Sequence, residues 1–296
     1  MLTRRLTLDP HHPDPGILAA AAAELRRGAL VAFPTETVYG LGVDPRQPSA
    51  LERLKALKDR EAAKPFALLL AEPEWAWQLS PTAPALARAL AERFWPGPLT
   101  LVLPGAEPEG IGCRIPNLRL TIELLRLTQG PLATPSANRA GERSPVNADE
   151  VARALEGEIE LILDGGECGV GLESTVLDLR GPRPQLRRPG GITIRELRRV
   201  APEVLPLPPS ERQPRFPIHF LAPGEEPPVG MPRLNWGDAP AGSLDLGADP
   251  LLAARELWPT LRRWPPGAAI ATVLPPADSP WEALRERLLW AAGLAL

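Results

Sequence analysis

A short apolar run that stops at a proline is the first constraint on this fold. Residues 29–33 read Ala-Leu-Val-Ala-Phe and are followed by Pro34. The run has the length of a buried strand, and proline ends its ladder pairing because it lacks an N–H group. The hydroxyl-rich segment 35–39 then leads to Gly40 and Gly42, which favour a tight turn. We expect a strand exit lined with polar groups, which either holds a small polar ligand or is a plain loop.

Helical and strand patterns alternate over the first 200 residues. Helices are predicted at residues 16–27, from 48 to about 57, and at 73–79, 82–94, 117–128 and 147–156. Strands are predicted at residues 29–33, 66–70, 99–103, 130–134 and 159–163, with a glycine-flanked extended segment at 109–116. A turn after Arg188 leads to a closing helix. This region therefore contains both helices and strands.

Proline marks a boundary after this region. Residues 201–240 hold eleven of the 39 prolines, which predicts a semi-rigid linker. Further strands are predicted at 218–221, 242–246 and 268–273, and further helices at 249–263 and 280–293. The predicted domains are a large one at residues 1–200 and a small α/β domain at 241–296, joined by the linker at 201–240. The first strand of the small domain is expected at 217–222, within the linker segment.

Composition excludes several classes of protein. No apolar run approaches the roughly 18 residues of a membrane span, and the N-terminus lacks the apolar core of a signal peptide. We therefore expect a cytoplasmic protein without membrane contact. Two cysteines, Cys113 and Cys168, and three scattered histidines make neither a disulfide framework nor a convincing metal site. Residues 1–200 carry 25 basic and 25 acidic side chains, which argues against strong nucleic-acid binding.

The three lysines of this chain lie within ten residues of one another. Lys55, Lys58 and Lys64 are the only lysines among 33 Lys and Arg residues. Unless the clustering is chance, it indicates that a compact ammonium is preferred there over a planar guanidinium. Lys58 and Arg60 lie where a predicted helix ends. They either neutralise a phosphate chain or occupy a solvated helix terminus.

Two further segments carry candidate binding groups. Arg114 lies in an extended segment between Cys113 and Ile115. This placement points to a side chain in a cavity, as for a carboxylate anchor, whereas a lone arginine is usually a surface residue. The turn-rich loop 134–145 places Ser136 and Asn138 on one side of extended chain. Their hydroxyl and amide groups suit phosphate oxygens, and an ordinary turn is the alternative.

Six short motifs follow one another along residues 33–190. They are Phe33-Pro-Thr-Glu-Thr-Val-Tyr-Gly-Leu-Gly42, the pair Lys58 and Arg60, Arg114-Ile-Pro116, Pro135-Ser-Ala-Asn138, Glu173-Ser-Thr-Val176 and Arg188-Pro-Gly190. Their order and spacing resemble the YrdC-like family of threonylcarbamoyl-AMP synthases over about residues 15–200. The C-terminal module resembles that of the longer, two-domain members. The resemblance implies an α/β fold with a twisted mixed sheet flanked by helices around a basic cavity, and a second, smaller α/β domain.

The resemblance also implies an activity. Such enzymes are nucleotidyltransferases that combine L-threonine, bicarbonate and ATP into L-threonylcarbamoyladenylate and pyrophosphate. This is the first step of the threonylcarbamoyl-adenosine modification of tRNA, so downstream threonylcarbamoyl-transfer proteins are expected partners, with at most weak tRNA contact. Mg²⁺ is expected to accompany ATP. The chemistry depends on positioning and charge neutralisation rather than on a covalent nucleophile.

Residue roles carried over from the family fall into three sets. The set implied to contact L-threonine is Thr35, Arg114, Thr134 and Ser174, with Arg114 on the carboxylate. The implied catalytic set is Lys58, Arg60, Ser136 and Asn138. The set implied to contact ATP is Arg60, Lys64, Ser136, Ser144 and Arg188.

The chain departs from the family pattern at three places. Lys64 stands where longer members have Asn, and Leu69 stands where they have a His that contacts threonine. The linker has no tyrosine to fold over the nucleotide, so closure would use Phe216, His219 or Phe220. The sequence leaves two alternative functions. One is a double-stranded RNA- or tRNA-binding module without turnover. The other is a carbamoyl-transfer domain of a hydrogenase maturation protein, which the lack of cysteine pairs disfavours.

Overall fold

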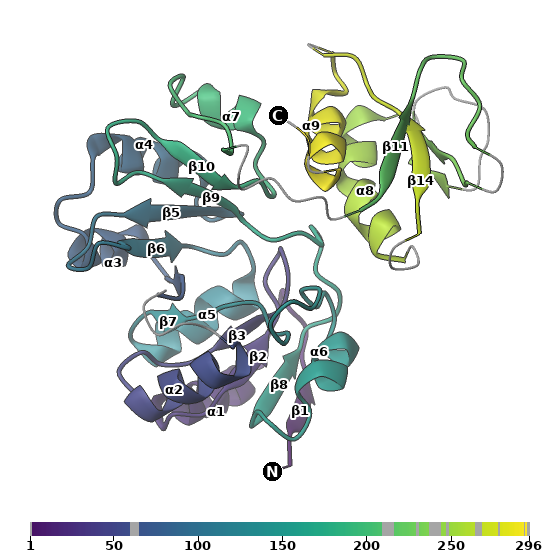
Figure 1. Ribbon diagram of the computed structural model, residues 1–296. Helices are drawn as coiled ribbons and strands as arrows, with labels where there is room; N and C mark the ends of the chain where they lie inside the picture. Colours follow the sequence, from purple (N-terminus) through teal and green to yellow (C-terminus); the bar gives the residue numbers. More distant parts are fainter. Residues whose placement is uncertain are drawn as a thin grey trace. The chain divides into compact units, whose positions relative to one another are not determined.

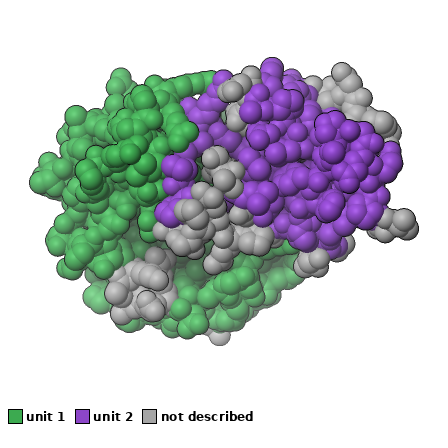
Figure 2. Space-filling model, turned by 45° about the horizontal axis from the view of Figure 1, so that its top comes forward, with its two compact units in different colours: residues 1–192, 196–205 green, residues 193–195, 206–296 purple. Residues whose placement is uncertain are grey.

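The chain forms two compact units. The computed structural model describes residues 2–59, 65–208, 216–228, 231–236, 244–246, 249–263, 268–277, 279–292 and 294. The first unit consists of residues 1–192 and 196–205, and the second consists of residues 193–195 and 206–296 (Figure 1 and Figure 2).

Two mixed sheets form the framework of the first unit. The first sheet has the strand order β1 (Arg4–Thr7), β8 (Leu161–Asp164), β2 (Val31–Phe33) and β3 (Gly40–Gly42). The second has the order β10 (Gln185–Arg188), β9 (Thr175–Asp178), β5 (Leu99–Leu103), β6 (Ile111–Arg114), β4 (Leu68–Leu69) and β7 (Leu132–Ala133). β1, β8 and β2 are parallel, whereas β2 and β3 are antiparallel. The second sheet likewise mixes parallel and antiparallel pairs, so the predicted fold class is confirmed.

Strands β3 and β7 join the two sheets at their edges. Val43 and Ala133 exchange two backbone hydrogen bonds of 3.0 Å each. The N–H of Leu41 donates to the carbonyl of Pro135 at 2.8 Å. The polar chain that leaves β2 is thereby held against the loop that leaves β7.

The predicted tight turn at Gly40 and Gly42 is wrong, because both residues belong to strand β3. The two glycines instead allow neighbouring side chains to come close to the backbone of β3. A Cβ on Gly40 would lie 2.5 Å from the Thr134 methyl group, and a Cβ on Gly42 would lie 2.5 Å from the Phe33 ring. Only a residue without a side chain fits at such distances.

Alternate residues around β2 face two different helical layers. Val31 and Phe33 share a core cluster with residues of α1 (Pro15–Arg26) and α5 (Arg119–Thr128). Leu30 and Ala32 share another with residues of α2 (Pro48–Leu57) and α6 (Ala148–Leu155). All four are fully buried. The period of two along the strand therefore places this sheet between two layers of helices. The first unit also contains α3 (Pro73–Leu79) and α4 (Ala85–Phe94), and α7 (Ile194–Arg198) follows the last strand.

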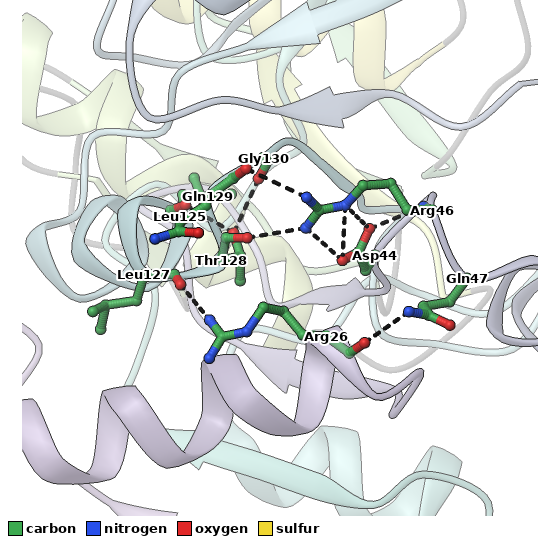
Figure 3. A network of polar contacts seen from close by, with 9 residues as sticks. All are labelled: Arg26, Asp44, Arg46, Gln47, Leu125, Leu127, Thr128, Gln129 and Gly130. Atoms are coloured by element: carbon green, nitrogen blue, oxygen red, sulfur yellow. Dashed lines mark hydrogen bonds and ion pairs between the residues drawn. The ribbon is translucent and has the colours of Figure 1, made fainter.

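Two arginines cap the C-terminal end of α5 (Figure 3). Arg46 donates to the carbonyl of Thr128 at 3.0 Å, and its guanidinium contacts the buried Asp44 carboxylate at 2.7 Å. Arg26, in the last turn of α1, donates to the carbonyl of Leu127 at 2.5 Å. Cations are favourable at this end of a helix because its last carbonyls are unpaired and carry negative partial charge. The network ties α1, α5 and the chain before α2 together.

The second unit is a small α/β structure. β11 (Ile218–Leu221) pairs in parallel with β14 (Ile270–Val273), and β12 (Leu234–Asn235) pairs in parallel with β13 (Leu244–Asp245). Helices α8 (Pro250–Arg263) and α9 (Glu282–Ala291) pack against each other. β11 and β12 lie within the proline-rich segment 201–240. The helices predicted at 249–263 and 280–293 are confirmed.

Most predicted elements of the first unit are also confirmed. The helices at 16–27, 73–79, 82–94, 117–128 and 147–156 correspond to α1, α3, α4, α5 and α6, and the strand at 99–103 corresponds to β5. The predicted strands at 66–70 and 130–134 are shortened to the two-residue strands β4 and β7. Strands β1, β10 and β12 were not predicted from the sequence.

Candidate active site

A cavity of about 590 Å³ in the first unit is lined by residues of both sheets. Its charged lining residues are Lys58, Arg114, Arg180, Arg187, Arg188, Glu109, Glu173 and Asp178. Among the described lining residues, cations therefore outnumber carboxylates by five to three, which agrees with the predicted basic cavity. The sequence-predicted residues that line it are Thr35, Lys58, Arg114, Thr134, Ser136, Ser174 and Arg188.

Two of the remaining predicted residues lie just behind this wall, and two lie outside the described residues. Asn138 and Ser144 are buried and contact lining residues, as described below. Arg60 and Lys64 fall outside the part of the chain that the structure describes. The structure therefore brings together nine of the eleven residues named from the sequence.

Thr35 shapes the strand exit where it meets the cavity. Its Oγ1 accepts hydrogen bonds from the N–H groups of Thr37 at 3.1 Å and Val38 at 3.2 Å. The same oxygen lies 2.7 Å from the Val38 carbonyl and 2.7 Å from the Thr37 hydroxyl. A threonine side chain that bonds the backbone two and three residues ahead forms a compact turn. This turn orients the Thr35 wall of the cavity.

Arg114 reaches the cavity from the end of β6 and is held on two sides. Its Nε donates to the carbonyl of Gly97 at 3.1 Å. Its Nη2 lies 2.7 Å from Oε1 of Glu36, and the two side chains are only 7% and 13% exposed. Both carboxylate oxygens of Glu36 and Nη2 of Arg114 are buried without a well-aligned hydrogen bond. The predicted carboxylate anchor therefore has an internal carboxylate beside it.

Hydroxyl groups continue along this wall from Thr100 to Ser174. The two hydroxyls lie 2.7 Å apart, and both residues are buried. Arg188 donates from Nε to the carbonyl of Ser174 at 2.9 Å and from Nη2 to its Oγ at 3.0 Å. Thr134 Oγ1 donates to the Leu132 carbonyl at 3.1 Å. Ser174 is thus fixed by both a hydroxyl and a guanidinium.

Lys58 adds a further cation to the wall. It is the C-cap residue of α2, and its Nζ donates to the carbonyl oxygens of Ser136 at 3.1 Å and Asn138 at 2.6 Å. Nζ also lies 3.1 Å from Oδ1 of Asn138. The Asn138 amide donates to the carbonyls of Arg139 and Glu142 within the same loop. A helix end and the loop 134–145 are therefore locked together around one ammonium group.

Two of the three described carboxylates of the cavity, Glu173 and Asp178, are engaged by neighbouring groups. Ser144 Oγ donates to Oε1 of Glu173 at 2.8 Å. Asp178 accepts from Nε of Arg180 at 2.9 Å and from Nη2 at 2.6 Å. Burial acts to raise the pKa of Asp178, but the hydrogen bonds from Arg180 outweigh it and hold this pKa below its ordinary value. Asp178 is therefore a carboxylate at neutral pH.

The sequence did not identify every polar residue of the wall. Thr100, Glu173, Arg180 and Arg187 line the cavity as well. Arg187 precedes the predicted Arg188, and Glu173 precedes the predicted Ser174, so adjacency in the motifs was an available signal for both. No comparable signal marked Thr100 within its apolar strand.

Tyr39, the single tyrosine, is fully buried and donates from its hydroxyl to the Gly166 carbonyl at 2.8 Å. Burial raises the pKa of Tyr39 well above its usual range, so the phenol stays neutral. Leu69, in place of the family's His, is buried and lines the cavity beside Arg114, with which it pairs across β4 and β6.

Among the residues that the structure describes, no group of three or more His, Cys, Asp or Glu side chains is arranged to hold a metal ion. None of the helices described there combines the length and the apolar composition that crossing a bilayer requires.

Comparison with known families and structures places this cavity in context. The Sua5/YciO/YrdC family model, described as telomere recombination, matches residues 23–190. A threonylcarbamoyl-AMP synthase of Pyrococcus abyssi is 43% identical over 193 residues, which are 62% of this chain and 57% of that protein. The chain therefore spans little more than half of that relative's length. A shorter threonylcarbamoyl-AMP synthase, from Chromohalobacter salexigens, is 41% identical over 175 residues, which are 55% of this chain and 92% of the relative.

A solved structure matches over nearly the whole chain. The crystal structure of Sua5 from P. abyssi in complex with L-threonine has 30% sequence identity and a TM-score of 0.78, and the match covers 98% of both chains. The likeness therefore includes the second unit as well as the first.

Proposed function

This chain belongs to the Sua5/YciO/YrdC family, and from that premise we propose that it is a threonylcarbamoyl-AMP synthase. The proposed reaction combines L-threonine, bicarbonate and ATP into L-threonylcarbamoyladenylate, pyrophosphate and water. In class it is a nucleotidyl transfer, and it is the first step of threonylcarbamoyl-adenosine formation in tRNA. The supporting observation is one cavity that is lined by the buried Arg114, by Lys58 and by further arginines.

The first unit contains the proposed active site. The Chromohalobacter relative is matched over 92% of its length by little more than half of this chain. A threonylcarbamoyl-AMP synthase of roughly this unit's size therefore exists. The family match at residues 23–190 also lies within the first unit. All the described residues that line the cavity belong to it.

L-threonine is proposed to bind on the Arg114 side. The guanidinium of Arg114 takes the substrate carboxylate, because a planar arginine matches a carboxylate in geometry and charge. Thr35, Thr134 and Ser174 supply the polar groups around the rest of the amino acid. The buried Leu69 offers an apolar surface in place of a polar histidine contact.

ATP is proposed to bind on the side of the loop 134–145. Lys58, Ser136 and Asn138 surround the reacting phosphates, while Ser144 and Arg188 hold further parts of the nucleotide. Arg60 and Lys64 are assigned to the same side by the sequence motif alone. Fixed cations stabilise the charge that develops on the transferred phosphorus without reorganising during the reaction.

Two bond-forming steps complete the reaction. The ammonium group of threonine first loses a proton to water. The resulting neutral amine attacks the bicarbonate carbon, a C–N bond forms, and water leaves to give the carbamate. A carbamate oxygen then attacks the α-phosphorus of ATP, and the bond to the bridging oxygen breaks to release pyrophosphate. The protein's task is to place three substrates in one geometry, which by itself lowers the barrier strongly.

Mg²⁺ is proposed to enter with ATP. Of the three described carboxylates of the wall, Asp178 is engaged by Arg180 and Glu173 by Ser144. An ion held mainly by phosphate oxygens and water fits such a site, because Mg²⁺ keeps several waters when it binds nucleotides. Downstream threonylcarbamoyl-transfer proteins in the cytoplasm are the proposed partners.

Pyrophosphate release tests the proposal directly. The full-length protein is incubated with ATP, Mg²⁺, L-threonine and bicarbonate, and each component is left out in turn. Release is expected only in the complete mixture, and mass spectrometry should detect the threonylcarbamoyl-adenylate. Release that does not require threonine and bicarbonate would refute the proposal. Salt-sensitive tRNA binding without turnover would favour the RNA-binding alternative.

A further inference from the structure

Glu36 stands out because the proposed reaction gives it no task. It lies in the exit of β2, next to Thr35, and its carboxylate is almost wholly withdrawn from solvent. Burying an ionised carboxylate is costly unless it is paired and hydrogen-bonded. Here both oxygens lack a well-aligned hydrogen bond, and the charge is met by Arg114 at 2.7 Å. A side chain kept in this position at such a cost calls for a reason other than stability.

The backbone around Glu36 holds it in this position. The Glu36 carbonyl accepts a hydrogen bond from the N–H of Val170 at 2.8 Å, and the neighbouring residues form the turn closed by Thr35. On the other side, Gly97 fixes Nε of Arg114. The pair therefore consists of two anchored groups of opposite charge, and Arg114 is the member that lines the cavity.

The charge balance of Arg114 and Glu36 affects which ligands this side of the cavity favours. Arg114 alone presents one positive charge and attracts any carboxylate. Arg114 together with Glu36 is neutral, so it suits a ligand that is neutral overall but has separated charges. An amino acid zwitterion is such a ligand, because its carboxylate meets Arg114 while its ammonium group feels the field of Glu36. Coulomb interactions act over several ångströms in a poorly solvated site, so Glu36 need not touch the ligand.

We propose that Glu36 is a specificity-determining residue that acts through Arg114, so that this side of the cavity accepts amino acids and rejects carboxylic acids that lack the amine. This inference rests on the proposed function for the identity of the amino acid. It adds a requirement for an amine on the ligand, which the predicted contacts of Thr35, Thr134 and Ser174 do not contain. The Glu36 carboxylate repels the carboxylate of either ligand, so it discriminates against the acid without an amine at the expense of affinity for the amino acid.

Calorimetric binding to the full-length protein without ATP tests the proposal. The two ligands are L-threonine and (R)-3-hydroxybutanoate, which is threonine without its amine. Wild-type protein should prefer threonine by about tenfold or more, and Glu36→Gln should reduce that preference by about tenfold, chiefly by strengthening the binding of the hydroxy acid. Glu123→Gln is the matched control, because it removes a carboxylate that also lies 2.7 Å from an arginine, Arg119, but is not among the described residues that line the cavity. Its preference should equal that of wild type.

Glu36→Asp keeps the charge but moves it away from Arg114 by one methylene. Its preference should lie between those of wild type and Glu36→Gln, and it decides the question alone if Glu36→Gln does not fold by circular dichroism. An unchanged preference in both variants would overturn the inference while leaving the proposed function intact. A wild-type protein that binds no threonine would instead count against the proposed function. Equal loss of preference in Glu123→Gln would also overturn the assignment to Glu36.

Discussion

Lys58 and Asn138 are joined twice, through one ammonium group. Nζ of Lys58 lies 2.6 Å from the backbone oxygen of Asn138 and 3.1 Å from its side-chain Oδ1. The lysine thus orders the loop that carries Ser136 and Asn138, and it also contributes a positive charge to the cavity wall. Loss of its side chain removes the charge and loosens the loop at the same time.

Lys58→Ala should therefore affect turnover far more than threonine binding. Removal of one preorganised electrostatic group costs about 10²–10³ in kcat in comparable sites. The dissociation constant of L-threonine should stay within about threefold, because Arg114 and its neighbours are unchanged. Pyrophosphate release and calorimetry provide the two measurements. Lys55→Ala is the control, since Lys55 lies on the same helix and pairs only with Glu52 among its described contacts. Equal losses in turnover and threonine affinity would argue against a phosphate role for Lys58.

Gly190 supports the position of Ser174 by leaving room for it. A Cβ on Gly190 would lie 2.4 Å from the carbonyl carbon of Ser174 and 2.3 Å from the nitrogen of Thr175. These are backbone atoms, so they cannot turn aside. Gly190→Ala should destabilise the protein by about 1–3 kcal/mol and weaken threonine binding, because Ser174 must shift.

Gly181→Ala is a suitable comparison for Gly190→Ala. The atom nearest to its Cβ is the carbonyl oxygen of Arg183, at 3.7 Å. That is ordinary contact, so stability and threonine affinity should stay close to wild type. Thermal denaturation and calorimetry measure both quantities. If Gly190→Ala and Gly181→Ala have the same stability and threonine affinity, the close packing at Gly190 affects neither quantity.

Sequence patterns revealed elements whose state depends on local composition. Strand β5 was placed correctly because Leu99–Leu103 is a continuous apolar run with a rigid proline break before it. Strand β1 was missed because Arg4–Thr7 reads Arg-Arg-Leu-Thr and is mostly exposed. Its extended state comes from pairing with β8, more than 150 residues away in the chain. Such pairing leaves no pattern in the paired segment itself.

The same distinction applies to the candidate site. Arg114 drew attention by itself, as a cation in a glycine-flanked apolar segment. Glu36 did not, because its surroundings in the chain are two threonines and a strand exit. It acquires meaning only when β6 places Arg114 at 2.7 Å. A buried ion pair formed by distant segments is visible in three dimensions alone.

Asp44 should be important for the stability of the first unit. Its side chain is 2% exposed and accepts hydrogen bonds from the backbone N–H and the guanidinium of Arg46 (Figure 3). Asp44→Ala leaves Arg46 without its counter-charge and loosens the cap on α5. We expect a loss of about 2 kcal/mol in the free energy of unfolding, because a buried hydrogen-bonded carboxylate is removed.

Asp149→Ala is the control for Asp44→Ala. Asp149 pairs with Arg5 but is 70% exposed, and exposed pairs contribute less than about 1 kcal/mol. Urea denaturation followed by circular dichroism compares the two variants with wild type. Similar midpoints for both variants would show that the network in Figure 3 is no stronger than a surface ion pair.

Cys113 should make stability fall at alkaline pH. Burial raises the pKa of its thiol to about 12, from an ordinary value of 9.0. Between these values the unfolded chain loses this proton and the folded chain keeps it, so unfolding becomes more favourable as pH rises above 9.0. At pH 10 the expected loss is about 1.4 kcal/mol relative to pH 8.

The variant Cys113→Ala loses a constant amount of stability to its cavity but lacks this titration. The stability advantage of wild type over Cys113→Ala should therefore shrink by about 1.4 kcal/mol between pH 8 and pH 10. Urea denaturation at both pH values measures the change, and the buried Tyr39 titrates equally in both proteins. A constant advantage would mean that the thiol of Cys113 ionises as readily in the folded protein as in the unfolded chain.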